Sequence, residues 1–298
     1  MLEFDQVSKR YGETVALRSL SFAVRPGQMF GFVGANGAGK TTAMRIALGV
    51  LAADAGEVRW AGQPVTFQNR RRFGYMPEER GLYPKMRVAE QLVYFARLHG
   101  LSAAAAAAAT DRWTERLGLA ERRADPVEKL SLGNQQRVQL GLALVHDPDV
   151  LVLDEPFSGL DPVGVDALAG ALTEKCQEGV PVVFSSHQLD LVERICDAVG
   201  IINAGAMVAT GTVAGLRRDA RRQLRVIAPQ APAGWAAPLS GVRVLSERDG
   251  EVLLELGTDP GAADDQAVLA AALRTGRVDH FSWREPTLTE LFREAVAA

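Results

Sequence analysis

One short glycine-rich segment of the sequence has the residues needed to hold phosphate groups. It reads GANGAGKTT, from Gly34 to Thr42, and it follows the apolar run Met29–Val33. The glycines let backbone N–H groups turn toward phosphate oxygens, and the start of a helix adds the positive end of its dipole. Lys40 can reach the β- and γ-phosphates, and the Thr41 hydroxyl can bind Mg²⁺. The segment predicts a site for a nucleoside triphosphate and its metal ion.

Carboxylates at the end of another apolar run form a second chemical group. Asp154 and Glu155 directly follow Val150–Leu153, and Asp161 comes after a turn. An apolar run without alternation is typical of a strand buried on both faces of a parallel sheet. A charge at such a strand end is costly unless a cation meets it. If this strand lies beside the one that leads into the phosphate loop, Asp154 faces the metal and Glu155 can polarise a water in line with the γ-phosphate.

Composition excludes several classes of protein. The chain has 298 residues, enough for one large or two modest domains, and 47% of them are hydrophobic. Its net charge of -3 and pI near 5.9 argue against a nucleic-acid-binding protein. No secretion signal or membrane-spanning run is evident, so we expect that this chain alone crosses no membrane. Cys176 and Cys196 fit no metal or redox spacing and are expected to be buried, reduced thiols.

Strand and helix signals alternate through about the first 215 residues. Strand and turn signals dominate residues 1–35, a helical pattern covers about residues 88–146, and strand–helix alternation then resumes. This order predicts an α/β domain with a parallel sheet and an inserted helical block. Within that block, the alanine run Ala103–Ala109 is expected to form an exposed helix.

A second, smaller domain is expected over residues 216–298. The composition shifts near residue 215, and a β/α pattern then begins that is typical of a small α+β domain. Two strand signals, Val242–Ser246 and Val252–Leu256, flank the turn sequence Glu247–Gly250, which predicts a hairpin.

Four further motifs carry a resemblance to a known family. LSLGNQQR spans Leu130–Arg137, SGLDP spans Ser158–Pro162, SSH ends at His187, and Tyr11 lies in KRYG. With the two phosphate motifs, and in this order, they resemble the signature loop, D-loop, switch histidine and adenine-stacking aromatic of an ABC transporter ATP-binding subunit of the exporter (ABC-2) type. The resemblance covers about residues 1–215. It implies a P-loop NTPase core with a parallel-sheet centre, an antiparallel N-terminal β region and an inserted helical subdomain.

The resemblance also implies the cofactors and the residues of the site. ATP and Mg²⁺ are the expected cofactors, with Glu155 as base or water-polarising group and His187 holding the attacking water. The metal ligands implied are Thr41, Asp154 and Glu78. The residues implied in nucleotide binding are Tyr11, Gly34, Asn36, Gly37, Ala38, Gly39, Lys40, Thr41, Thr42, Ser131, Gly133, Asn134 and Asp161.

Two positions depart from the usual pattern of the family. The signature loop has Leu132 and Asn134 where the family has glycine and glutamine, but Ser131 and Gly133, the inferred contact residues, are present. Leucine has less φ freedom than glycine. Glu78 replaces a glutamine; an ionised carboxylate can still bind a metal but cannot donate a hydrogen bond. We expect Glu78 to sense Mg²⁺ and the γ-phosphate.

The resemblance implies particular partners for this chain. Two such chains, identical or similar, pack head to tail around two ATP molecules, and each dimer drives a separate integral membrane permease, with no nucleic acid involved. The apolar segment after Glu78, through Tyr83 and Met86, is the expected docking region. The chain is then cytoplasmic and peripheral on the inner face of the membrane, and export is favoured over import. The alternatives are a soluble ABC ATPase acting on ribosomes or DNA, and a regulatory nucleotide-binding module without turnover.

Overall fold

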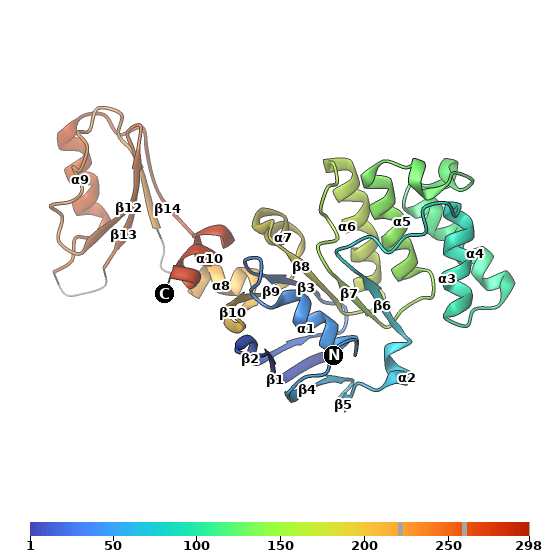
Figure 1. Ribbon diagram of the computed structural model, residues 1–298. Helices are drawn as coiled ribbons and strands as arrows, with labels where there is room; N and C mark the ends of the chain where they lie inside the picture. Colours follow the sequence, from blue (N-terminus) through green and yellow to red (C-terminus); the bar gives the residue numbers. More distant parts are fainter. Residues whose placement is uncertain (220–222, 258–260, 298) are drawn as a thin grey trace. The chain divides into compact units, whose positions relative to one another are not determined.

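The computed structural model of the protein describes residues 1–219, 223–257 and 261–297 (Figure 1). The described chain separates into two compact units, Met1–Val213 and Ala214–Ala298. Each unit has its own sheets and its own hydrophobic core.

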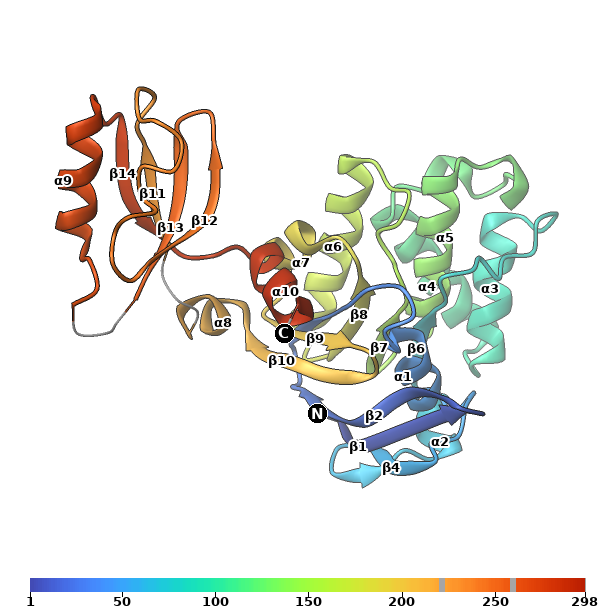
Figure 2. The same cartoon turned by 60° about the vertical axis from the view of Figure 1, so that its left-hand side comes forward.

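The first unit is built around a six-stranded sheet (Figure 2). Along the sheet the strands are β10 (Ala206–Thr212), β9 (Ala198–Asn203), β3 (Met29–Val33), β8 (Val182–Ser186), β7 (Val150–Leu153) and β6 (Phe73–Met76). All neighbours are parallel except β10, which runs antiparallel to β9. The predicted α/β class is therefore confirmed. Since parallel strands end at the same edge, the segments after β3, β7 and β8 come together there.

A second, antiparallel sheet packs against the first. It has the order β2 (Thr14–Val24), β1 (Leu2–Tyr11), β4 (Ala55–Trp60) and β5 (Gln63–Pro64). Phe22 of β2 stacks on Phe4 at 4.3 Å between ring centroids, and on Phe30 and Phe32 of β3 at 5.1 and 5.2 Å. Helix α1 (Lys40–Ala47) adds Ala43, Met44, Ile46 and Ala47 to the same core. The helix that follows the glycine-rich loop is thus fixed by burial between the two sheets.

Helices make up the rest of the first unit. They are α2 (Phe67–Arg70), α3 (Val88–Leu98), α4 (Ala103–Arg116), α5 (Leu132–Leu144), α6 (Pro162–Gln177) and α7 (Leu189–Ile195), with 3₁₀ turns at Ala120–Arg122 and Val127–Lys129. The alanine run forms a helix as predicted, but the expectation that it is exposed is wrong in part. Ala106 is fully buried and Ala109 nearly so, because small side chains let α4 pack closely against α3 and α5.

The sequence predicted that the two cysteines are buried, reduced thiols. Cys176 and Cys196 are free thiols as predicted, but each is half-buried, not fully buried. Burial raises the pKa of Cys176 to about 12, so this thiol stays protonated.

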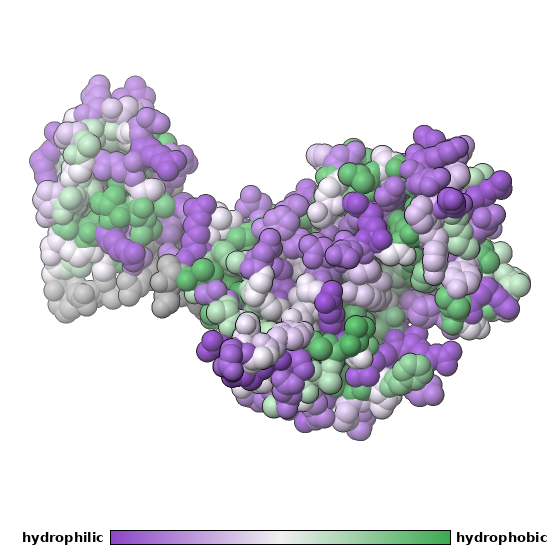
Figure 3. Space-filling view, viewed as in Figure 1, coloured by the Kyte–Doolittle hydropathy of each residue, from purple (hydrophilic) through white to green (hydrophobic). Residues whose placement is uncertain are grey.

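Among the described residues no helix combines the length and the apolar character that a membrane span requires. The face drawn in Figure 3 is mostly hydrophilic, with smaller hydrophobic areas.

The second unit is an antiparallel sheet with a helix on one face (Figure 2). The sheet order is β12 (Val242–Arg248), β13 (Glu251–Leu256), β11 (Gln223–Ile227) and β14 (His280–Arg284); the helices are α8 (Val213–Asp219), α9 (Asp265–Thr275) and α10 (Leu288–Ala297). Val268 and Ala272 of α9 join a core with Leu224 and Leu254 of the sheet. Asp249 and Gly250, both with positive φ, turn β12 into β13, so the predicted hairpin is confirmed.

Candidate functional site

The glycine-rich loop connects β3 to α1 in a conformation that requires its glycines. Gly37 and Gly39 have φ values of 79° and 111°, in the region that other residues rarely adopt. A Cβ at Gly39 would lie 2.6 Å from the carbonyl oxygen of Ala16, and one at Gly34 would lie 2.5 Å from that of Ile202. The loop therefore passes too close to β2 and β9 for side chains at these positions.

Lys40 at the start of α1 is a buried cation held by weak partners. Its side chain is only 7% exposed, and its Nζ donates to the carbonyl oxygens of Gly34 at 2.7 Å and Ala35 at 3.2 Å. Burial lowers the pKa of Lys40, and the nearby charges of Glu155, Asp154 and Glu78 partly oppose this. Two neutral carbonyls compensate an ammonium less well than an anion does, so a phosphate oxygen is the stronger partner for Lys40.

Asp154, after β7, is a buried carboxylate in which one oxygen accepts a hydrogen bond and the other does not. It is 1% exposed; its Oδ1 accepts from the Ser185 hydroxyl at 2.5 Å, and Ser185 Oγ accepts from the Glu155 N–H at 2.8 Å. The other oxygen, Oδ2, is buried and has no hydrogen-bond partner among the described residues. A buried carboxylate oxygen without a partner is costly unless a cation compensates it.

Glu155 and His187 form a hydrogen-bonded pair at the ends of adjacent strands. His187 Nδ1 lies 2.9 Å from Glu155 Oε2, and because an ionised carboxylate only accepts, Nδ1 carries the proton. Glu155 has a φ of 50°, a strained conformation for a residue with a side chain. The side-chain amide of Gln136 donates to the carbonyl oxygens of Glu155 and Pro156 at 3.4 and 3.0 Å and thereby holds this turn.

Lys40, Asp154 and Glu155 line one open cavity of about 350 Å³. Most of its lining was predicted from the sequence: Asn36, Gly37, Gly39, Lys40, Thr41, Thr42, Glu78, Asp154 and Glu155. Ala16 of β2 also lines it, and the sequence carries no signal for this residue because it is one small side chain in a long strand.

The residues present fit a magnesium ion bound together with a triphosphate. Thr41, Asp154 and Glu78 all line the cavity and are oxygen donors, the ligands that Mg²⁺ prefers. Within the described ranges no three His, Cys, Asp or Glu side chains form a ready metal cluster. The unpartnered Asp154 Oδ2 therefore offers one protein ligand, and phosphate oxygens and water must supply most of the others.

Other predicted residues do not line this cavity, and two of them cap helices. The Ser131 hydroxyl caps α5 by accepting from Asn134 N–H at 3.3 Å, and Asp161 caps α6 by accepting from Gly164 N–H at 2.6 Å. Tyr11 is 49% exposed at the end of β1. Gly34, Ala38, Gly133 and His187 are also not among the lining residues.

Comparisons with known proteins identify the family. A family profile described as ABC transporter matches residues 17–158. The chain is 38% identical to an uncharacterised ABC transporter ATP-binding protein of Bacillus subtilis (strain 168), covering 100% of this chain and 99% of that protein. The chain belongs to the ABC transporter ATP-binding family. It is also 31% identical to the linearmycin resistance ATP-binding protein LnrL of the same organism, over 98% of this chain and 97% of that protein.

Structures of known cassettes agree with this assignment. The structure of an ATP-binding subunit of an ABC transporter is similar with a TM-score of 0.68 and 31% identity, covering 74% of this chain and 92% of the other. A second profile, described as the C-terminal domain of DrrA1-3-like ATP-binding proteins, matches residues 211–296 of this ABC subunit. ABC cassettes are ATPases that power transport, so the non-transport reading on ribosomes or DNA is not favoured.

Proposed function

We propose that this ABC subunit hydrolyses Mg·ATP in the cavity between the glycine-rich loop and the end of β7. One observation carries the proposal: the buried, unpartnered Oδ2 of Asp154 shares a cavity with Lys40 and Thr41. The triphosphate lies along the loop, where Lys40 exchanges its carbonyl partners for phosphate oxygens. Thr41, Asp154 and Glu78 would hold a Mg²⁺ ion, which would supply positive charge to offset the negative charge on the phosphates.

The pair of Glu155 and His187 prepares the attacking water. Glu155 lies at the end of the buried strand, fixed by Ser185 and Gln136, and its carboxylate is 10% exposed. It accepts the hydrogen bond of the water and takes up its proton as the bond to phosphorus forms. His187 donates from Nδ1 to Glu155, and this contact orients the carboxylate. The rest of the imidazole remains accessible, since the His187 side chain is 58% exposed.

A second chain completes the site. Ser131, Gly133, Asn134 and Asp161 do not line the cavity of their own chain, yet the α5 N-terminus that carries the first three can bind anions. These residues and the exposed Tyr11 contact ATP in a head-to-tail dimer, identical or mixed with a similar chain. A bacterial ABC transporter cassette of the same fold, 22% identical with a TM-score of 0.64, is described as dimeric.

A separate groove receives the membrane permease. It has a volume of about 300 Å³ and its walls are mainly apolar and aromatic; they include Phe73, Tyr75, Pro77, Leu82, Phe95, His99, Leu142 and His146. Tyr83 and Tyr94, 51% and 41% exposed, lie beside it in an aromatic cluster with Phe95. A short permease helix in this groove places the ABC subunit on the cytoplasmic face of the membrane. Export is the direction favoured, since relatives include proteins for linearmycin resistance and Nod factor export.

Replacing Glu155 with glutamine tests the hydrolysis claim. The variant keeps the shape of the side chain but cannot accept the proton of water, so we expect ATPase turnover to fall by about 10²–10⁴-fold. ATP binding, measured with a fluorescent ATP analogue, should persist because Lys40 and Thr41 are unchanged. Turnover that persists in the variant would show that another group acts as the base.

A further inference from the structure

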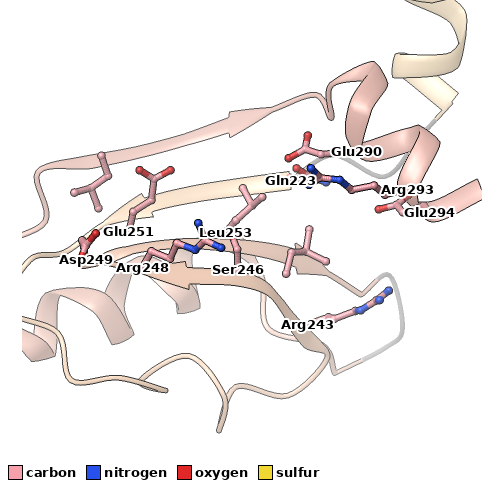
Figure 4. A pocket seen from close by; sticks show the side chains of 12 residues that line it. Gln223, Arg243, Ser246, Arg248, Asp249, Glu251, Leu253, Glu290, Arg293 and Glu294 are labelled. Carbon is pink, nitrogen blue, oxygen red and sulfur yellow. The ribbon is translucent and has the colours of Figure 1, made fainter. Parts of the chain in front are cut away.

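The open face of the sheet in the second unit contains a cavity that the ATP-binding function does not use. This cavity, of about 680 Å³, is of the size that drug-sized ligands occupy. Its lining comes from three strands and one helix: Gln223, Ile227, Arg243, Leu245, Ser246, Arg248, Asp249, Glu251, Leu253, Glu290, Arg293 and Glu294 (Figure 4). All of these residues belong to the unit Ala214–Ala298.

A β-bulge places both arginines of β12 along this cavity. Side chains of a regular strand alternate between faces, so Arg243 and Arg248, five positions apart, would face opposite sides. The pairing of β12 with β13 shifts between Val244 and Ser246, which inserts Leu245 as an extra residue. Arg243 and Leu245 before the shift, and Ser246 and Arg248 after it, consequently all line the cavity.

Among the residues that the structure describes, the arginines of the cavity have no charge partners, whereas half of its carboxylates are paired with arginines. Glu251 accepts two hydrogen bonds from Arg225, at 2.8 and 2.9 Å, and Glu290 accepts two from Arg284, at 3.0 and 2.5 Å. By contrast, Arg243, Arg248 and Arg293 form no ion pair with any residue that the structure describes. Three unpaired guanidinium groups therefore face two exposed carboxylates, those of Asp249 and Glu294.

A buried side chain in the same cavity offers an unused acceptor. Gln223 is only 3% exposed, and its Oε1 is buried without a hydrogen-bond partner in the described part of the chain. Figure 4 shows Arg293 extending from α10 toward Gln223, and Arg248 lying by Leu253. Leu253, 8% exposed, and the half-buried Ile227 and Leu245 provide apolar surface between these polar groups. A buried acceptor of this kind is unfavourable unless a donor reaches it.

We infer that this cavity binds a small amphipathic anion, a carboxylate or phosphate monoester with an apolar body. Arg248 and Arg293 hold the anionic group, because guanidinium groups bind carboxylates and phosphates in bidentate fashion. The apolar body lies on Leu253 and its neighbours, and a hydroxyl or N–H of the ligand donates to Gln223 Oε1. The ligand is either a free amphiphile or the headgroup of an anionic lipid, which share this chemistry.

Calorimetric titration of the full chain tests the inference with three probes: octyl phosphate, octyl glucoside and inorganic phosphate, each below micelle-forming concentrations. We expect octyl phosphate to bind at least about tenfold more tightly than the neutral glucoside or the phosphate alone. Arg248→Gln and Arg293→Gln should each weaken octyl phosphate binding by about tenfold, which corresponds to about 1.4 kcal/mol. Gln223→Leu should weaken it severalfold without lowering thermal stability, because the acceptor it removes has no protein partner.

Arg274→Gln is the matched control, since this exposed arginine lies on α9 at the opposite face of the sheet. It should leave binding unchanged, and all variants should keep the basal ATPase activity. Equal binding of the glucoside and the phosphate ester, no binding of either, or an equal loss in Arg274→Gln would overturn the inference. Co-sedimentation with phosphatidylglycerol vesicles, lost in Arg248→Gln, would support a lipid headgroup as the source; octyl phosphate binding without co-sedimentation would support a free amphiphile.

Discussion

Replacing Asp154 with asparagine should have opposite effects on the free protein and on its Mg·ATP complex. In the ligand-free protein, Asp154 is a buried carboxylate whose Oδ2 has no partner, while its Oδ1 accepts from Ser185. Asparagine keeps an acceptor for Ser185 and removes the buried charge. The amide nitrogen then takes the place of the unpartnered oxygen, but a buried neutral group without a partner is less unfavourable than a buried charge, so we expect the free energy of unfolding to rise by about 1 kcal/mol.

In the presence of Mg·ATP, the effect of Asp154→Asn on the free energy of unfolding has the opposite sign. Mg·ATP at 100 times its Kd stabilises the folded protein by about 2.7 kcal/mol. The amide of asparagine is a weaker metal ligand than a carboxylate, so a tenfold or greater loss of affinity should remove about 1.4 kcal/mol or more of this stabilisation. The variant should therefore start from a higher melting temperature and gain less from Mg·ATP.

Differential scanning calorimetry with EDTA, with ATP and EDTA, and with Mg·ATP separates these effects. For a unit of this size, about 1 kcal/mol moves Tm by about 2–4 °C. Asp166→Asn, an exposed carboxylate on α6 that pairs with Arg194, should behave like the unmodified protein in all three conditions. An Asp154→Asn protein that is less stable without nucleotide, yet gains as much from Mg·ATP, would refute the reasoning about its unpaired oxygen.

Three further changes follow from other parts of the first unit. Glu78→Gln should shift the Mg²⁺ concentration for half-maximal ATPase activity severalfold; an unchanged titration would remove Glu78 from the metal site. Burial, and to a smaller extent the neighbouring His99, lowers the pKa of His146 to about 4. As the pH falls, the unfolded chain therefore binds this proton before the folded protein does. Stability should therefore fall by about 3 kcal/mol between pH 6.5 and 4, and His146→Gln should abolish most of this fall in urea unfolding. Gly39→Ala should lower the free energy of unfolding by at least about 2 kcal/mol and abolish ATP binding, because its φ is 111° and its Cβ would clash with a carbonyl oxygen. Gly170→Ala is the control: it has open space around it and should be neutral or mildly stabilising in the same assays.

Local motifs explain why most residues that line the cavity beside the glycine-rich loop could be predicted from the sequence. The loop from Gly34 to Thr42 depends on backbone conformations that its own glycines permit, and the strand before it is continuous in the sequence. Asp154 and Glu155 follow a strand whose wholly apolar composition requires burial on both faces. Parallel strands then bring these segments to one edge of the sheet, as the register of β3, β8 and β7 shows.

Features that depend on contacts between distant segments could not be predicted in this way. Ser185 links Asp154 to the backbone of Glu155, yet a serine at a strand end has many other uses. Ala106 is buried and its neighbours are exposed because of how α4 meets α3 and α5, which a uniform alanine run does not specify. The bulge at Leu245 arises from the pairing of two strands, and only the structure shows which face its arginines line.

The central claim is that this ABC subunit powers a membrane permease through the groove beside Tyr83. We would purify tagged Glu155→Gln protein in mild detergent with ATP and Mg²⁺, and the same protein carrying Leu82→Glu in the groove, and identify what accompanies each by mass spectrometry. We expect one integral membrane protein in near-equal amount with Glu155→Gln, and its loss when Leu82→Glu is added. Recovery of only ribosomal or DNA-associated proteins, with no integral membrane protein, would contradict it.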